Sequence, residues 1–99
     1  MEIDGFEKLE SFSVGLQHLQ RLSFRYCPNL KKVSSHPQHL TSLQELSFFS
    51  CPKMKDLPEM LLPSLLRLDI LVDCPGLEER CSKKGSYWPL ISHIPCILI

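Results

Sequence analysis

The chain has 99 residues, 43% of them hydrophobic, and its eleven Lys and Arg residues balance eleven Asp and Glu residues. This length is enough for one small domain with a modest core. The balanced charge argues against a nucleic-acid or acidic-membrane partner, because both need a clustered positive field. The first residues resemble no signal peptide, and no run approaches the roughly 18 apolar residues of a membrane span. We therefore expect a cytoplasmic protein whose thiols stay reduced.

One pattern recurs three times along the chain, and it is marked by Cys27, Cys51 and Cys74, which lie 24 and 23 residues apart. Apolar residues stand 8, 5 and 3 positions before each cysteine and 3 positions after it, with one residue inserted in the third copy. They are Leu19, Leu22, Phe24 and Leu30; Leu43, Leu46, Phe48 and Met54; and Leu65, Leu68, Ile70 and Leu77. A period of 22–24 with Cys at this position is typical of a leucine-rich repeat.

The repeat predicts five parallel strands lying side by side, because each copy contains an alternating L-x-Φ segment in which Φ is apolar. The strands are expected near 1–4, 21–25, 45–49, 67–71 and 96–99. We expect a single domain over 1–99, with a partial repeat at 1–15, repeats at about 16–39, 40–61 and 62–80, and a C-terminal cap with the last strand at 81–99. Prolines between the strands disfavour long helices, so short turns or one-turn helices are expected, with 37–42 and 59–62 the better helical segments.

Cys-Pro follows each of the three central strands. A small apolar thiol can turn inward at a bend and satisfy main-chain groups there, and Pro prevents the strand from continuing. A metal site and a column of disulfides are the alternatives. Zinc sites need closely spaced ligands such as C-x₂-C, and disulfides are rare in a reducing compartment. Buried corner thiols are therefore the preferred interpretation.

The chain contains no recognisable catalytic motif. Neither G-x-S-x-G nor H-E-x-x-H occurs, and glycine stands only at 5, 15, 76 and 85, which excludes a G-x-x-x-x-G-K-[ST] loop. Cys81 and His93 could form a thiolate pair, but their places in the repeat fit a core thiol and a cap-region histidine better. We expect a protein that is not an enzyme, with no cofactor and no bound metal.

The block 62–99 resembles the end of the leucine-rich-repeat region of plant nucleotide-binding disease resistance proteins. The residues that carry the resemblance are LEERC at 77–81, WP at 88–89 and I-x-H-I-P at 91–95. The resemblance implies an α/β repeat fold, a leucine-rich-repeat solenoid with a parallel sheet on its concave face and short turns or one-turn helices on its convex face. It also implies a truncated fragment, because the nucleotide-binding domain of those receptors is absent from this sequence.

Leucine-rich repeats bind through the concave face of their sheet, and alternation indicates which residues point there. The predicted protein-binding residues are Arg21, Ser23, Arg25, Tyr26, Glu45, Ser47, Phe49, Arg67, Asp69 and Leu71. Across neighbouring strands Arg21, Glu45 and Arg67 alternate in sign and can pair with one another. Tyr26, Phe49 and Leu71 place apolar groups on a face that should be wet, which favours partner binding.

The resemblance implies a protein-interaction module of a plant immune receptor in the defence response. Its partner would be a pathogen effector or the receptor's own nucleotide-binding domain. The alternatives are a non-immune leucine-rich-repeat scaffold, such as a substrate adaptor of a ubiquitin ligase, and a non-functional gene fragment. We also expect self-association through an uncapped N-terminal edge, at which Met1, Ile3, Phe6, Leu9 and Phe12 would be partly bare.

The spacing of the cysteines predicts that all five are reduced and free of metal. Thiol titration of denatured protein, prepared without oxidant, should find five thiols per chain, and metal analysis should find no stoichiometric zinc. A lower thiol count would indicate disulfides, and stoichiometric zinc would indicate a metal site.

Overall fold

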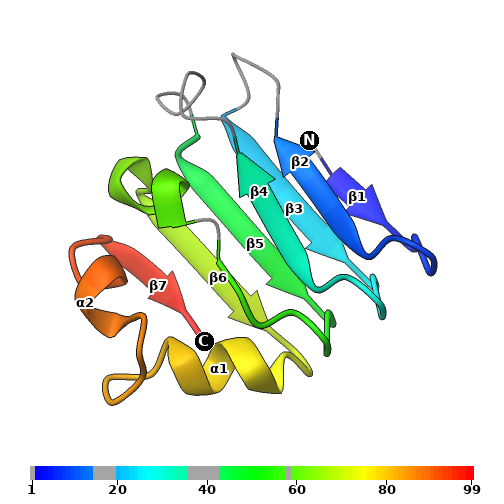
Figure 1. Cartoon of the computed structure of the whole chain (residues 1–99). Helices are drawn as coiled ribbons and strands as arrows, with labels where there is room; N and C mark the ends of the chain where they lie inside the picture. Colours follow the sequence, from blue (N-terminus) through cyan, green and yellow to red (C-terminus); the bar gives the residue numbers. More distant parts are fainter. Residues whose placement is uncertain (1, 15–19, 36–42, 58) are drawn as a thin grey trace.

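The computed structural model describes residues 2–14, 20–35, 43–57 and 59–99. Within these ranges the strands form two parallel sheets (Figure 1). The larger sheet contains β1 (Glu2–Asp4), β3 (Arg21–Arg25), β5 (Glu45–Phe49), β6 (Arg67–Leu71) and β7 (Cys96–Leu98), in that order. The smaller sheet contains β2 (Ser11–Val14) and β4 (Lys32–Ser35). The prediction of a parallel α/β arrangement is confirmed.

The five predicted strands match the larger sheet to within a residue at each end. Equivalent positions of successive repeats face each other across it, so that Leu22 pairs with Leu46 and Leu46 with Leu68. This register follows from the sequence period, because each repeat moves the chain one strand along the sheet. Met1 and Leu19, and the predicted helical segment 37–42, lie outside the described residues.

One face of the larger sheet forms the core. Along β3 and β5 buried residues alternate with partly exposed ones, as a strand with one buried face requires. The rings of Phe24 and Phe48 stack at 5.5 Å between centroids, and Phe12 meets Phe24 edge-on at 5.3 Å. Leu22, Leu46 and Leu68 belong to one continuous buried cluster, as the sequence predicted. Each such side chain contributes about 1.5–3 kcal/mol by leaving water.

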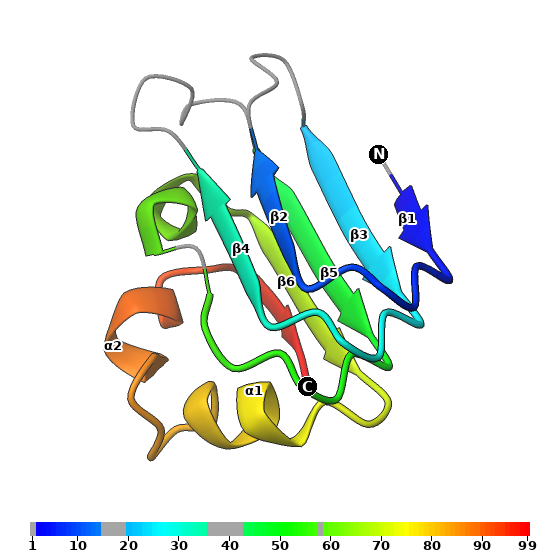
Figure 2. The ribbon, with the colours of Figure 1, turned by 45° about the vertical axis from the view of Figure 1, so that its right-hand side comes forward.

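A second layer covers this face of the sheet (Figure 2). It consists of β2, β4, the 3-10 helix η2 (Glu59–Ser64) and, toward β7, the helices α1 (Pro75–Arg80) and α2 (Trp88–Ile91). The helical segment predicted at 59–62 is confirmed. β2 and β4 were not predicted from the sequence, because the alternation in β2 (SFSV) is only four residues long and β4 (KVSS) has a single apolar residue. Phe12 and Val33 face each other across the pair, and Phe12 packs against the core.

β1, β3, β5 and β6 are each followed by a left-handed backbone directly before the cysteine position. The residues concerned are Gly5 (φ 73°), Tyr26 (φ 53°), Ser50 (φ 54°) and Asp73 (φ 52°), together with the inserted Val72 (φ 52°). Hydrogen bonding between strands continues into these turns. The N–H of Tyr26 donates to the carbonyl of Phe49 at 2.9 Å, and the N–H of Ser50 donates to that of Val72 at 2.8 Å. The backbone hydrogen bonds that join the strands therefore also join the turns.

The corner cysteines lie immediately after these left-handed residues and are completely buried. The Cys27 thiol lies 3.4 Å from the carbonyl of Arg25, and the Cys74 thiol lies 3.5 Å from that of Val72. The backbone N–H of Cys51 donates to the Cys74 sulfur at 3.4 Å. The thiols thus add hydrogen bonds to main-chain groups at the bend, as the sequence predicted, although the carbonyls of Arg25 and Val72 also accept backbone N–H groups.

The third repeat continues into α1, a six-residue helix, where the sequence predicted a short turn or a one-turn helix. Pro75 stands at the first position of this helix, where its missing N–H removes no helical hydrogen bond. The same Cys-Pro pair therefore ends a strand in every repeat and begins a helix in the third.

The segment between α1 and α2 passes very close to α1. A Cβ at Gly85 would lie 2.1 Å from the carbonyl oxygen of Arg80, so only glycine fits there. The approach brings Tyr87 into the core, where its hydroxyl accepts a hydrogen bond from the N–H of Leu57 at 3.2 Å. Cys81 and Ile91 are completely buried beside it. This end of the core is covered by the chain itself.

The other end of the core is less well covered. Phe6, which takes the cysteine position of the partial repeat, is 56% exposed. Leu9 and Phe12 are partly buried against the core. The expectation that Ile3 would also be bare is wrong, because its side chain is buried within the core cluster. Self-association through this edge stays a prediction.

Thiol burial predicts a loss of stability in alkaline solution. Burial raises the pKa of Cys51 and of Cys81 from 9.0 to about 12 in the folded protein. A folded-state pKa above the unfolded one stabilises the fold fully below pH 9, and this contribution disappears as the pH rises from 9 toward 12. The free energy of unfolding should therefore fall over this range in denaturant titrations.

Cys81→Ala should weaken this pH dependence, because it removes one of the thiols whose pKa is raised by burial while leaving every lysine and tyrosine in place. Cys96→Ala, at a partly exposed thiol on β7, is the matched control and should keep the dependence of the natural sequence. Equal pH dependence in the Cys81→Ala variant and the natural sequence would contradict the assignment.

Candidate interaction surface

The face of the larger sheet that points away from the core is called the open face here. In the described part of the chain no second layer lies over it (Figure 2). Its side chains are Glu2 and Asp4; Arg21, Ser23 and Arg25; Glu45, Ser47 and Phe49; Arg67, Asp69 and Leu71; and Cys96 and Leu98. All the predicted protein-binding residues belong to it except Tyr26, which lies one residue beyond β3. Their role in binding stays a prediction.

Strand pairing arranges the open face in three rows across the sheet. The first row is Arg21, Glu45, Arg67 and Cys96; the second is Glu2, Ser23, Ser47, Asp69 and Leu98; and the third is Asp4, Arg25, Phe49 and Leu71. Cys96 and Leu98 were not among the outward-facing residues predicted from the sequence. The spacing of Ile97 and Ile99 could have predicted them, because side chains alternate between the two faces of a strand and these isoleucines point inward in the pattern.

The charges of the first two rows pair with one another. Arg21 Nε lies 3.0 Å from Glu45 Oε2, which confirms one half of the predicted Arg21–Glu45–Arg67 ladder. The other half is wrong, because Arg67 Nε instead lies 3.0 Å from Asp69 Oδ2 on its own strand, and this contact raises the pKa of Arg67. Residues two apart on a strand share a face, so Asp69 lies within reach of Arg67.

Asp69 is the most enclosed polar group of the open face, with only 8% of its surface exposed. Its carboxylate accepts hydrogen bonds from Arg67 Nε and from Ser47 Oγ, the latter at 3.3 Å. Beside this network lies a hollow of about 230 Å³ lined by Glu2, Arg21, Ser23, Glu45 and Ser47, together with Leu22. The first two rows therefore present a polar surface with paired charges and room for a small side chain.

The third row ends in a group of aromatic and apolar side chains. The rings of Tyr26 and Phe49 meet edge-on with centroids 5.3 Å apart. The Arg25 guanidinium carbon lies 5.3 Å from the Phe49 centroid and 5.9 Å from that of Tyr26, within cation–π range. Leu71 faces Phe49 across the sheet, and Val72 follows it, 56% exposed. Tyr26, Phe49, Leu71 and Val72 are called the apolar strip.

Sequence reasoning found most of the strip but missed Val72. This residue is the one inserted before the third cysteine, so it has no equivalent in the other repeats and no position in the pattern. Its backbone is left-handed, and its carbonyl accepts a hydrogen bond from the N–H of Ser50 in the neighbouring turn.

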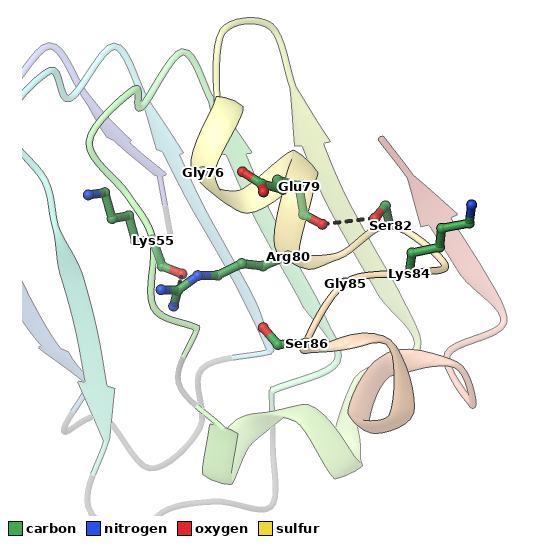
Figure 3. A pocket seen from close by; sticks show the side chains of 8 residues that line it. All are labelled: Lys55, Gly76, Glu79, Arg80, Ser82, Lys84, Gly85 and Ser86. Carbon is green, nitrogen blue, oxygen red and sulfur yellow. Dashed lines mark hydrogen bonds between the residues drawn. The ribbon is translucent and has the colours of Figure 1, made fainter.

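A hollow of about 610 Å³ lies away from the open face, beside α1 and the segment that follows it (Figure 3). Its cationic side chains do not converge on one point. Arg80 donates to the carbonyl of Lys55 at 3.2 Å and pairs with Asp56 at 2.8 Å. The side chains of Lys55 and Lys84 extend in opposite directions from the hollow (Figure 3). The arrangement does not form a site for a single anion.

The thiolate pair considered from the sequence is not assembled by any contact among the described residues. Burial raises the pKa of Cys81 to about 12, so its thiol is protonated at neutral pH. His93 Nε2 instead lies 3.1 Å from the carbonyl oxygen of Leu62. Across the described ranges, no three His, Cys, Asp or Glu side chains are grouped so that they could hold a metal ion.

Comparison with models of known protein families, with curated proteins and with solved structures found no match to this chain. Every helix in the described residues falls short of the length and apolar character that crossing a membrane requires. The resemblance noted in the sequence therefore rests on the residue pattern alone. The open face, with its paired charges and apolar strip, is the feature of the structure on which a function can be based.

Two of the ion pairs of the open face, Arg67–Asp69 and Arg21–Glu45, should differ in their contributions to stability. Asp69→Ala removes charge-assisted hydrogen bonds from an enclosed carboxylate and should lower the free energy of unfolding by about 1–2 kcal/mol. Glu45→Ala is the matched control, because it removes the more exposed pair with Arg21 and should cost less than about 1 kcal/mol. Urea titration at neutral pH measures both. Equal losses would show that enclosure of Asp69 adds nothing.

Proposed function

We propose that this chain is a protein-interaction module that binds a partner protein through the open face. The observation that carries the proposal is the exposed apolar strip at the edge of that face, where the strands end. Tyr26 is 50% exposed and Val72 56%, and they adjoin Phe49 and Leu71. Aromatic side chains at the centre of contacts, surrounded by polar groups, are typical of protein interfaces. The paired charges of the other two rows supply such polar surroundings.

We also propose that the fold is the end of a leucine-rich-repeat solenoid whose concave surface is the open face. The 22–24-residue period and the pairing of equivalent residues across the sheet support this proposal. The repeated corner thiols support it as well. The repeats are those expected at about 16–39, 40–61 and 62–80, followed by the cap at 81–99.

The biological role that fits best is recognition within a plant immune receptor, in the cytoplasm. The partner is a pathogen effector or the receptor's own nucleotide-binding domain. Support comes from the block 62–99, whose resembling residues have structural roles. Cys81 and Ile91 are buried in the core, WP begins α2, and His93 contacts the carbonyl of Leu62. These residues close one end of the core, as the end of a repeat region requires.

Blocking the open face should abolish binding while leaving the fold intact. The double variant Arg21→Glu and Ser23→Tyr reverses one charge and fills the hollow beside it, at strand positions that accept both residues. We expect at least about tenfold weaker binding. The measurement is isothermal titration against purified pathogen effectors and purified nucleotide-binding domains of plant immune receptors.

The matched control is Lys84→Glu with Ser86→Tyr, which makes the same two changes at exposed positions beside α1. It should bind like the natural sequence, and both variants should keep its circular dichroism spectrum. Loss of binding in the control alone would place the interface on the other side of the molecule. Absence of binding to every protein of the panel would contradict the immune role.

A further inference from the structure

We propose that Arg25, Tyr26 and Phe49 form a clamp for an apolar side chain that stands next to a carboxylate in the partner protein. The inference rests on the proposed function, because it names the part of the open face that recognises the partner and the chemistry it recognises. It depends on three observations, which are the backbone of Tyr26, the position of the Arg25 guanidinium and the charges that surround it.

The backbone of Tyr26 adopts a conformation that disfavours the residue present. Each turn of the larger sheet needs a left-handed residue, and Gly5, Ser50 and Asp73 meet this need with glycine or a small polar side chain. Tyr26 and Val72 meet it with a bulky and a β-branched residue, for which this region is strained. Both side chains are at least half exposed, so burial offsets little of this strain. Their identities are therefore better explained by a contact with a partner than by the stability of the turn.

The Arg25 guanidinium lies over both rings rather than away in solvent. It is 5.3 Å from the Phe49 centroid and 5.9 Å from the Tyr26 centroid. Its ion pair with Glu2 is long, at 3.4 Å, and both side chains are about half exposed. Such a pair contributes little and exchanges easily. Arg25 can therefore leave Glu2 and bind a carboxylate of the partner while it stays over the rings.

The charges around the clamp determine the direction from which a carboxylate can approach. Glu2 and Asp4, on β1, repel an acidic group on that side. On the opposite side the row continues with Phe49 and Leu71, which carry no charge. A partner segment that crosses the strip can thus place an apolar side chain between Tyr26 and Leu71 and its carboxylate on Arg25. In an extended segment the side chains of residues i and i+2 share a face about 7 Å apart, so two such residues can supply the carboxylate and the apolar side chain.

A single-stranded nucleic acid is the other ligand that exposed aromatic rings can bind, through base stacking. The open face argues against it. Glu2, Asp4, Glu45 and Asp69 would repel a phosphate backbone, and Arg21, Arg25 and Arg67 are each paired with one of these acids or lie beside it. We therefore infer a protein partner, and an oligonucleotide serves as the competing probe.

The test uses Tyr26→Gly, which removes the ring and at the same time supplies the residue that the turn favours. The matched control is Ser50→Gly, which relieves the backbone at the equivalent turn and leaves the ring in place. Tyr26→Gly should therefore keep or raise the melting temperature, so that lost binding cannot result from unfolding. Phe49→Ser tests the second ring, and its melting temperature is measured alongside.

The probe is a displayed library of random 12-residue peptides selected on the natural sequence. We expect enriched peptides to carry Asp or Glu two positions from Leu, Phe or Trp. Their affinity should fall about tenfold or more in Tyr26→Gly and in Phe49→Ser, and should stay within about twofold in Ser50→Gly. Arg25→Gln should reduce the affinity of acidic peptides and leave that of their Asn or Gln analogues unchanged.

The possible failures distinguish the two proposals. Peptides that lose binding with Arg21→Glu plus Ser23→Tyr but not with Tyr26→Gly would overturn the clamp and leave the open face as the interface. Peptides that are insensitive to all open-face variants, or the failure to enrich any peptide, would overturn both. Enrichment of basic peptides, or tighter binding of a random-sequence single-stranded oligonucleotide than of the selected peptides, would overturn the chemistry assigned to the clamp.

Discussion

The left-handed turn that follows β1, β3, β5 and β6 is the constraint on which the other elements depend. It takes the chain out of the sheet, and it must do so without leaving main-chain groups buried and unpaired. The N–H groups of Gly5, Tyr26 and Ser50 donate to carbonyls of the next strand or its turn, and the corner thiols add further hydrogen bonds to main-chain groups there. Cysteine suits this position because it is small, apolar and weakly able to hydrogen-bond.

The two layers of the molecule follow from these turns. After each turn the chain returns on one side of the larger sheet only, and it does so as β2, as β4 or as short helices (Figure 2). In the described ranges, the apolar residues at the pattern positions before and after each cysteine are therefore buried between the sheet and these segments. The open face is left to polar side chains that pair with each other and to the apolar strip at the edge where the strands end.

The strands could be predicted closely because two independent signals agree on them, the period of the repeat and the alternation within each copy. The segments of the second layer carry weaker signals. β2 and β4 each depend on backbone pairing with the other, which a single segment does not reveal. α1 follows the same Cys-Pro pair that elsewhere leads into a turn, and the segment after it approaches the end of the helix closely at Gly85. The secondary structure of these segments is therefore determined by tertiary contacts rather than by local sequence.

The interaction surface shows the same division. Alternation placed the open-face residues correctly, since the faces of a strand depend on parity alone. Which charges would pair was harder to predict, because Arg67 can reach both Glu45 across the sheet and Asp69 on its own strand. Val72 could not be predicted from the repeat, because an inserted residue has no equivalent position in the other copies. The predictions therefore failed where a side chain could form either of two ion pairs, and where an inserted residue interrupted the repeat.

The register of the larger sheet has a consequence for how this surface can vary. Its side chains stand on a fixed lattice, about 4.8 Å apart along a row and about 7 Å apart along a strand, because the backbone beneath them is held by hydrogen bonds that do not involve them. An altered side chain at one lattice point leaves the coordinates of the others unchanged. Binding preference can therefore diverge among relatives one lattice point at a time, without a compensating change in the core.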